Sequence, residues 1–297
     1  MATAFCPAHI TGFFKAELDK EDSKELGSLG AGFSIQKGVK TTVTIRNKTK
    51  HDISNFTIKI NGFESGDMRV SEVVLSKFST KGKFVDIIHE IDVPVGYGFG
   101  SSAAVALSLS IALNDALECK LSKIKVAQIA HDVEIECKTG LGDVLASYYG
   151  GFEIRDKPGA PGIGHVQKIT LNKISIIMIC FSPISTSKFI KERLPRINGL
   201  GGKMVNKLLE SKNYEHFQEM SLEFAKYVDV MTPRMQKVVN ELSKNNIKCG
   251  IALFGETIFS MIPKENENKI LKILEKYSDG IIIKSELDDT GARVLYN

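Results

Sequence analysis

The sequence lacks any apolar run that approaches the roughly 18 to 20 residues needed to cross a bilayer. Its most apolar segment, Ala103–Leu113, is followed at once by the polar pair Asn114-Asp115. The first residues, Met1–Pro7, lack the basic segment and following apolar segment that mark a secretion signal. We therefore expect a soluble, cytoplasmic protein with no membrane partner.

Cysteine is scarce and scattered. The chain has no C-x-x-C motif, and its five cysteines are Cys6, Cys119, Cys137, Cys180 and Cys249. An odd and dispersed set argues against a disulfide framework and against a zinc site, and it is typical of reduced thiols inside a cell. We expect most of these cysteines to be small core residues.

The chain also lacks a strong excess of one charge. Its 39 basic and 35 acidic residues give a net charge of +4, spread evenly along the sequence. This balance does not favour nucleic acid or an anionic membrane as a partner, whereas it is compatible with small anionic substrates. Hydrophobic residues make up 43% of the 297 positions, which is enough for buried cores in about two domains.

A stretch rich in proline and glycine, 156–164, marks the candidate domain boundary. We predict one domain over residues 1–165 and a second over 166–297. The predicted elements of the second domain follow the order strand-helix-helix-strand-strand-helix-strand, which is typical of a split βαβ, ferredoxin-like arrangement. Periodicity predicts strands at 3–9, 40–47, 84–93 and 174–181, helices at 101–113, 122–138, 202–210, 214–231 and 233–245, and a polar loop at 182–188.

The stretch 94–104 organises the chain. Gly96, Gly98 and Gly100 alternate with other residues, and two serines then open the apolar run that predicts a buried helix from about Ser101. A glycine loop that opens a helix offers several backbone N–H groups and the positive end of the helix dipole. Because glycines let the backbone approach an anion closely, the stretch predicts a phosphate-binding site.

Three interpretations of this loop compete. It could be a structural turn before a core helix. It could bind a dinucleotide, because Gly98-x-Gly100-x-x-Ala103 fits a relaxed G-x-G-x-x-A fingerprint with Asp115 or Glu118 as the acidic partner. It could also bind a nucleoside triphosphate outside the Walker class, since the chain has no G-x-x-x-x-G-K-[ST]. A dinucleotide site is disfavoured, because the loop lies well inside the chain and not in a βαβ unit at its start.

The full motif decides between them. Pro94-x-x-x-Gly98-Phe99-Gly100-Ser101-Ser102-Ala103-Ala104 resembles the P-x-x-x-G-L-G-S-S-A-A phosphate loop of the GHMP small-molecule kinases. The resemblance implies an α+β fold of two domains, an N-terminal domain like ribosomal protein S5 domain 2 and a ferredoxin-like C-terminal domain. It implies ATP and Mg²⁺ as cofactors, with ATP held by Pro94, Gly96, Gly98, Gly100, Ser101, Ser102 and Ala103.

The same resemblance assigns the catalytic groups. An acidic residue on the helix 122–138 is the family's Mg²⁺ ligand, which points to Glu134, whereas Glu136 faces away and is expected to be a solvated charge. Ser102, or Ser101 in a shifted register, would give the metal its hydroxyl, with helix capping as the alternative role. Asp143 would accept the proton of the substrate hydroxyl or orient that hydroxyl. Its alternative role is the N-cap of a helix at 144–149.

One branch of the family, the pantoate kinases of archaea, is closer still. Pro7-x-His9-Ile10-Thr11-Gly12, Gly27–Gly32 and Lys138–Asp143 resemble that branch. His9 stands where other members have a lysine, so a lysine-assisted mechanism cannot be carried over. The family's third motif, a glycine-rich loop, is reduced here to Cys249–Thr257. The glycines at 27–32 indicate either a backbone pressed against a ligand or a tight hairpin entry.

The resemblance to this branch implies transfer of the γ-phosphoryl group of ATP to the 4-hydroxyl of pantoate, in coenzyme A biosynthesis. A carboxylate substrate favours an arginine partner, and Arg155 is our candidate, with a surface salt bridge as the alternative. Ser28, His131 and Thr186 are further candidate substrate ligands. Shikimate, mevalonate or homoserine as acceptor, a non-catalytic ATP-dependent sensor and a nicotinamide dehydrogenase remain alternatives. A homodimer is a further expectation.

Overall fold

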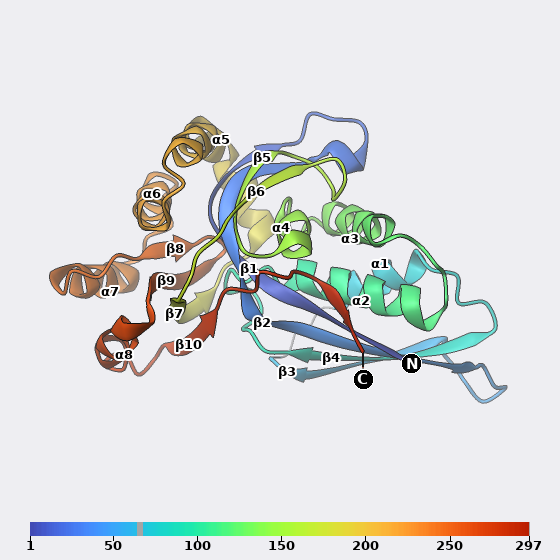
Figure 1. The fold of residues 1–297 in the computed structure, drawn as a ribbon. Helices are drawn as coiled ribbons and strands as arrows, with labels where there is room; N and C mark the ends of the chain where they lie inside the picture. The colour runs from blue at the N-terminus through green and yellow to red at the C-terminus, as the bar shows by residue number, and fades with distance from the viewer. Residues whose placement is uncertain (64–67, 297) are drawn as a thin grey trace.

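The computed structural model describes residues 1–63 and 68–296, which form two β-sheets with helices packed around them (Figure 1). The first sheet has the order β11-β1-β2-β4-β3, and β5 and β6 continue from another part of β2. Its strands are β1 (Ala2–Glu17), β2 (Gly27–Asn47), β3 (Phe56–Gly62), β4 (Lys83–Ile91), β5 (Phe152–Lys157), β6 (His165–Ile169) and β11 (Arg293–Leu295).

The length of β2 explains this branching. Residues 39–47 of β2 pair with β4, whereas residues 30–33 pair with β5, so the two halves of this one strand pair with two different strands. β1 is also longer than the strand predicted at 3–9, and it continues to Glu17. The reason is that α2 and α4 pack on β1 from one side and α5 and α6 from the other, so both faces of Ile10–Phe14 are buried.

Four helices accompany the first sheet: α1 (Arg69–Ser76), α2 (Ser101–Ala116), α3 (Lys123–Cys137) and α4 (Asp143–Tyr149). α2 begins directly after Gly100, as predicted. α3 confirms the prediction for 122–138, because the Ser122 side chain accepts a hydrogen bond from the Lys125 N–H and Lys138 ends the helix in the left-handed conformation. α4 begins at Asp143 itself, with Gly142 in the N-cap position. The N-cap role considered for Asp143 is therefore wrong.

The second sheet is antiparallel throughout and has the order β10-β7-β9-β8. In chain order this is the 4-1-3-2 arrangement of a split βαβ unit, as the sequence predicted. Its elements are β7 (Ile174–Pro183), α5 (Thr186–Ser211), α6 (Tyr214–Tyr227), α7 (Pro233–Lys244), β8 (Gly250–Ala252), β9 (Gly255–Pro263), α8 (Glu267–Leu274) and β10 (Ile281–Glu286).

α5 corrects the prediction of a polar loop at 182–188 and of a helix confined to 202–210. The helix begins at Thr186, runs through Pro195 and ends at Ser211. The serines and threonine at its start hid the helix from a periodicity argument, because such residues are equally typical of loops. As a result, the first turn of α5 faces the cavity described below.

The two sheets share one hydrophobic core. The ring of Phe217 on α6 lies 5.8 Å from that of Phe13 on β1 and 5.7 Å from that of Phe259 on β9, between ring centroids. β11, near the C-terminus, pairs with β1, so both chain ends lie side by side (Figure 1). β6 and β11, which follow the predicted boundary at 165, therefore belong to the first sheet. The boundary itself stays a prediction.

Across the described residues, no helix combines the length and the apolar character needed to cross a membrane.

Two glycines of α5 provide a matched test of how this helix packs on β1. A Cβ at Gly201 would overlap the carbonyl oxygen of Phe14, whereas a Cβ at the exposed Gly199 would meet only the Tyr227 hydroxyl, at 3.3 Å. We expect Gly201→Ala to destabilise the protein by about 1–3 kcal/mol through overpacking. Gly199→Ala should instead stabilise it by up to about 1 kcal/mol, because alanine favours the helix. Urea unfolding of both variants measures this, and equal effects would contradict the packing.

Candidate active site

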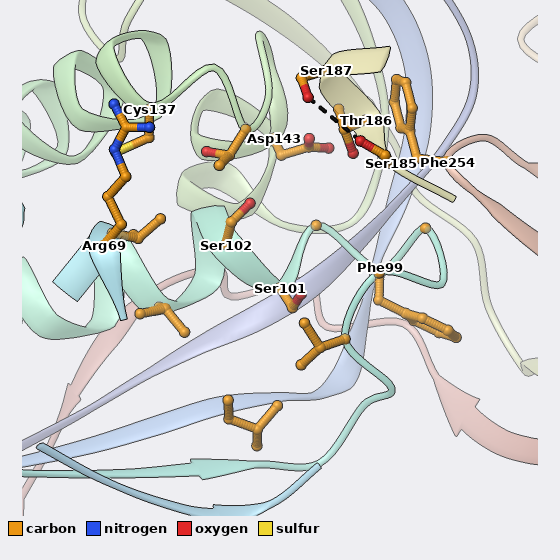
Figure 2. Close-up of a pocket in the computed structure, with 18 of the residues that line it drawn as sticks. Arg69, Phe99, Ser101, Ser102, Cys137, Asp143, Ser185, Thr186, Ser187 and Phe254 are labelled. Atoms are coloured by element: carbon orange, nitrogen blue, oxygen red, sulfur yellow. Dashed lines mark hydrogen bonds between the residues drawn. The ribbon is translucent and has the colours of Figure 1, made fainter. Parts of the chain in front are cut away.

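A cavity of about 480 Å³ opens between the glycine loop, the starts of α2 and α5, and α4 (Figure 2). Gly96, Gly98, Gly100, Ser101 and Ser102 all line it, as predicted for a phosphate loop. The other two predicted loop residues, Pro94 and Ala103, are buried and do not line the cavity.

The three loop glycines are required by the backbone. Gly96, Gly98 and Gly100 have φ angles of 83°, 87° and 56°, in the region that favours glycine. A Cβ at Gly98 would also overlap the carbonyl oxygen of Leu253, in the turn between β8 and β9. The loop is therefore fixed against that turn, and the first turn of α2 presents its unpaired N–H groups at the cavity.

The two serines of the loop have different places. Ser101 is buried, whereas Ser102 is half-buried and its hydroxyl projects from α2 toward the space that Asp143 faces (Figure 2). Of the two candidate metal ligands, Ser102 is thus the one whose hydroxyl enters the part of the cavity near the acidic residues.

Glu134 lies at the back of the site on α3 and is 1% exposed. Neither of its carboxylate oxygens has a hydrogen-bond partner. Glu134 Oε1 and Asp143 Oδ2 both lie within 3.0 Å of the position that a Cβ on Gly140 would occupy, so the two carboxylates are neighbours. Burial, and then the charge of Asp143, raise the pKa of Glu134 well above its usual value, while the charge of Arg155 opposes this shift.

This arrangement fits a divalent cation. A buried carboxylate without a partner, a second carboxylate and the Ser102 hydroxyl are all oxygen ligands of the kind that Mg²⁺ prefers. Within the described part of the chain, no three His, Cys, Asp or Glu side chains form a metal-binding group. When Mg²⁺ binds together with phosphates, it usually takes its remaining ligands from the phosphates and water.

Asp143 is also linked to a buried histidine that the sequence did not assign to the site. Asp143 Oδ1 lies 2.7 Å from His9 Nδ1, and Glu153 Oε1 lies 3.0 Å from His9 Nε2. Each ring nitrogen thus faces a carboxylate oxygen, which favours the imidazolium form of His9, while Arg155 Nη1 also lies 3.3 Å from His9 Nε2. Burial lowers the pKa of His9, but the hydrogen bonds to Asp143 and Glu153 outweigh it and raise that pKa.

The contact with His9 also affects the pKa of Asp143. Burial raises the pKa of Asp143, but the hydrogen bond from His9, the His9 charge and Arg155 together hold it below its usual range. Thr11 adds a weak hydrogen bond, with its hydroxyl 3.5 Å from Asp143 Oδ1. The contact with His9 thus favours the ionised form of Asp143.

Arg155 lies in the same network and not at the surface, so the surface salt bridge considered for it is wrong. It is 1% exposed, and its Nη1 donates to Glu153 Oε1 at 2.5 Å, while its Nε has no partner. Ser28 is next to it, because a Cβ on Gly142 would lie 3.0 Å from Arg155 Nε and would overlap the Ser28 hydroxyl. Both residues line a small second cavity of about 10 Å³, which Asp143 also lines.

The glycines at 27–32 make room for this network. Gly30 and Gly32 of β2 pair with Arg155 and Glu153 of β5. A Cβ on Gly30 would lie 2.6 Å from Arg155 Nη2, and one on Gly32 would lie 2.5 Å from His9 Nε2. The backbone is therefore pressed against charged side chains of the protein itself, which is neither of the two predicted reasons for these glycines.

The remaining predicted residues lie in different places. Thr186, the first residue of α5, lines the large cavity on the side toward Asp143 (Figure 2). His131 is not brought to the site: its Nε2 lies 3.1 Å from the Ser23 carbonyl oxygen, and it lines neither cavity. Glu136 is half-exposed and pairs with Lys77, which confirms that it is a solvated charge.

Besides His9, sequence reasoning missed Glu153 and Thr11 as residues of the site. Glu153 gave no signal beyond its place two residues before Arg155, because a lone glutamate in a strand next to a loop is expected to be solvated. Thr11 gave one signal, its place within the His9-Ile10-Thr11-Gly12 segment. Two residues apart on β1, Thr11 and His9 share one face of the strand and both approach Asp143.

Comparison with known proteins identifies the class. Residues 68–151, which hold the glycine loop, α2, α3 and Asp143, match the GHMP kinases N terminal domain. Together with the full-length relatives described next, this shows that the chain belongs to the GHMP kinase family. The predicted family is thereby confirmed, and the kinase interpretation of the loop replaces the structural turn and the dinucleotide site.

Two relatives carry a more specific name, pantoate kinase. The one from Methanocaldococcus jannaschii is 34% identical over 277 residues, 91% of this chain and 96% of the relative. The one from Thermococcus kodakarensis is 29% identical and covers 91% of each chain. The solved structure of a phosphotransferase related to the CoA biosynthesis pathway has a TM-score of 0.87 at 28% identity, over 98% of this chain and 97% of that one. The predicted α+β fold class is confirmed.

The charge state of His9 gives a direct test of the network. Asp143→Asn removes the carboxylate that faces His9 Nδ1, so we expect the pKa of His9 to fall. The stabilisation from its imidazolium is complete below the unfolded pKa of about 6.5 and is lost as pH rises through the raised folded pKa, so it should shrink in the variant. Histidine NMR titration measures the change, with Glu136→Gln as the matched control. An unchanged His9 titration would contradict the pairing.

Proposed function

We propose that the protein is an ATP-dependent kinase that transfers a phosphoryl group to the 4-hydroxyl of pantoate. The observation that carries the proposal is the cavity itself, which has the glycine loop on one side and the half-buried, ionised Asp143 on the other. The acceptor comes from the relatives, two of which are named pantoate kinases and align with 91% of this chain.

In this proposal the glycine loop and the N-terminus of α2 hold the triphosphate of ATP through backbone N–H groups. Glu134 and Ser102 hold Mg²⁺, which when bound neutralises charge on the phosphate oxygens. The raised pKa of Glu134 supports this role, because a carboxylate that is buried without a partner gains most from a cation beside it. In addition, Gly140 packs against both Glu134 and Asp143, so the two carboxylates lie close together.

Asp143 binds the acceptor hydroxyl. Its lowered pKa keeps it ionised at neutral pH, so it can accept a hydrogen bond from the hydroxyl and later take its proton. A carboxylate with a low pKa is a weak base, which suits a loose transition state in which the proton leaves late. His9 holds the carboxylate in place through its 2.7 Å hydrogen bond, and Glu153 holds His9 from behind.

The acceptor's carboxylate would approach Arg155 and Ser28, which lie beside Asp143 at the small cavity. The Nε of Arg155 is the group that lacks a partner, so it is the natural donor to a carboxylate. Thr186 would contact the acceptor from the opposite side, at the start of α5. His131 is not part of the proposal, because it lines neither cavity. The predicted homodimer stays a prediction.

A coupled ADP-release assay with MgATP tests the function. Among pantoate, shikimate, mevalonate and homoserine, we expect pantoate to give the highest kcat/KM, and calorimetry should show binding of MgATP and not of NAD. Turnover of another acceptor alone would keep the kinase and overturn the substrate. Binding of MgATP with no turnover of any acceptor would favour the alternative of a non-catalytic sensor.

Two substitutions separate the roles of the carboxylates. Asp143→Asn should lower kcat by about 10²- to 10⁴-fold with little change in ATP binding, because it removes the proton acceptor. Glu134→Gln should also slow the reaction, but it should in addition raise the Mg²⁺ concentration needed for half-maximal rate. Steady-state kinetics at several Mg²⁺ concentrations measures both, with the solvated Glu136→Gln as control. An unaltered Mg²⁺ requirement in Glu134→Gln would show that Glu134 is no ligand.

A further inference from the structure

The turn between β8 and β9 holds an aromatic residue in an unfavourable backbone conformation. Phe254 has a φ of 68°, in the left-handed region that favours glycine. The other non-glycine residues with positive φ in the described part of the chain are all charged or polar. The family's third motif is glycine-rich, and a glycine would adopt this conformation without strain. The retention of a bulky ring here therefore calls for a functional reason.

The turn that carries Phe254 is firmly fixed. The Leu253 N–H donates to the Thr11 carbonyl oxygen at 3.1 Å, and the Thr257 hydroxyl donates to the Tyr97 carbonyl oxygen at 2.8 Å. Gly98 of the phosphate loop packs directly against the Leu253 carbonyl group. The turn is thus tied both to β1 and to the phosphate loop, so the ring of Phe254 has a defined position relative to both.

The ring forms an apolar wall beside the reacting groups. Its centroid lies 5.6 Å from that of Phe14 and 5.2 Å from that of Phe189, and the residue is half-buried. Phe254 lines both the large and the small cavity, and it shares this property only with Thr11 and Asp143 among the described residues that line them. Figure 2 shows its ring near Thr186, on the side of the cavity that Asp143 faces.

We propose that Phe254 is a specificity-determining residue that recognises the dimethyl carbon of the acceptor. This inference rests on the proposed function. In pantoate the dimethyl carbon lies between the carbon that bears the 4-hydroxyl and the carbon that bears the 2-hydroxyl and the carboxylate. With the 4-hydroxyl at Asp143 and the carboxylate directed toward Arg155, the two methyl groups come to the part of the site between these residues, which Phe254 borders.

The apolar side chains that line the small cavity are Phe14, Leu141, Ile190 and Phe254, and of these only Phe254 also lines the large cavity. Thr11, Ser28, Asp143 and Arg155 are polar or charged and can recognise the hydroxyls and the carboxylate, but they distinguish poorly between a dimethyl carbon and a CH₂ group. An apolar wall makes that distinction through contact area, typically by about 10- to 200-fold in kcat/KM for a small apolar group. The acceptor that lacks the methyl groups, 2,4-dihydroxybutanoate, is therefore the informative comparison.

The test compares both acceptors in the full-length protein and in Phe254→Gly. Glycine fits the backbone conformation at this position, so the turn is expected to keep its shape. In the unaltered protein we expect kcat/KM for pantoate to exceed that for 2,4-dihydroxybutanoate by about 10- to 200-fold. In Phe254→Gly this ratio should fall at least tenfold, through a loss with pantoate, while the KM for MgATP changes by less than about twofold.

Phe189→Leu is the matched control, because Phe189 packs on the Phe254 ring but lines neither cavity. This variant should keep the ratio of the unaltered protein. An unchanged ratio in Phe254→Gly, or the same fall in both variants, would overturn the proposal and leave Phe254 as part of the aromatic core. Failure of the unaltered protein to phosphorylate either acceptor would instead overturn the proposed function, so the two failures are distinguishable.

Discussion

The imidazolium of His9, buried between Asp143 and Glu153, is the constraint on which the site depends. A buried charge is tolerated only when it is paired and hydrogen-bonded, and removing one partner of such a pair typically costs about 3–5 kcal/mol. His9 and Arg155 face Asp143 and Glu153, so two positive and two negative groups compensate one another inside the protein. Glu134 lies outside these pairs, and its burial, followed by the charge of Asp143, raises its pKa well above the usual value.

Such a cluster requires space in the backbone around it. Gly30 and Gly32 of β2 lie against Arg155 and His9. Gly140 lies against the carboxylates of Glu134 and Asp143, and Gly142 lies against Ser28 and Arg155. In each case a single Cβ would enter the position of a polar side-chain atom. These glycines are therefore required for two different reasons. In the phosphate loop the backbone has positive φ angles, and around the charged cluster there is no room for a Cβ atom.

This division explains how much the sequence could predict. The loop and α3 depend on local patterns, namely glycine spacing, a cap at Ser122 and helical periodicity, and the structure has both at the predicted residues. Glu134 and Asp143 were chosen from the family resemblance, and their roles stay predictions. The pairing of His9 with Glu153 joins residues that are 144 positions apart, through the register of β1, β2 and β5. The periodicity of a sequence does not reveal how strands that are far apart in the chain pair with one another. His131 shows the opposite case. It is buried on the same helix as Glu134 and was a predicted substrate ligand, but its Nε2 contacts the Ser23 carbonyl oxygen and it lines neither cavity.

The two sides of the cavity also differ in their origin. The glycine loop and the start of α2 come from one continuous segment, 94–104, which lies within the residues that match the family's N-terminal domain. The acceptor side is assembled from β1, β5, α4, α5 and the β8–β9 turn, which the two sheets bring together. A change in any one of these elements alters the acceptor side without touching the phosphate loop. In such a fold the phosphoryl donor can stay the same while the acceptor changes. The hydrogen bond from the Leu253 N–H to the Thr11 carbonyl oxygen joins the β8–β9 turn to β1, so the second sheet contributes to the acceptor side from a fixed position.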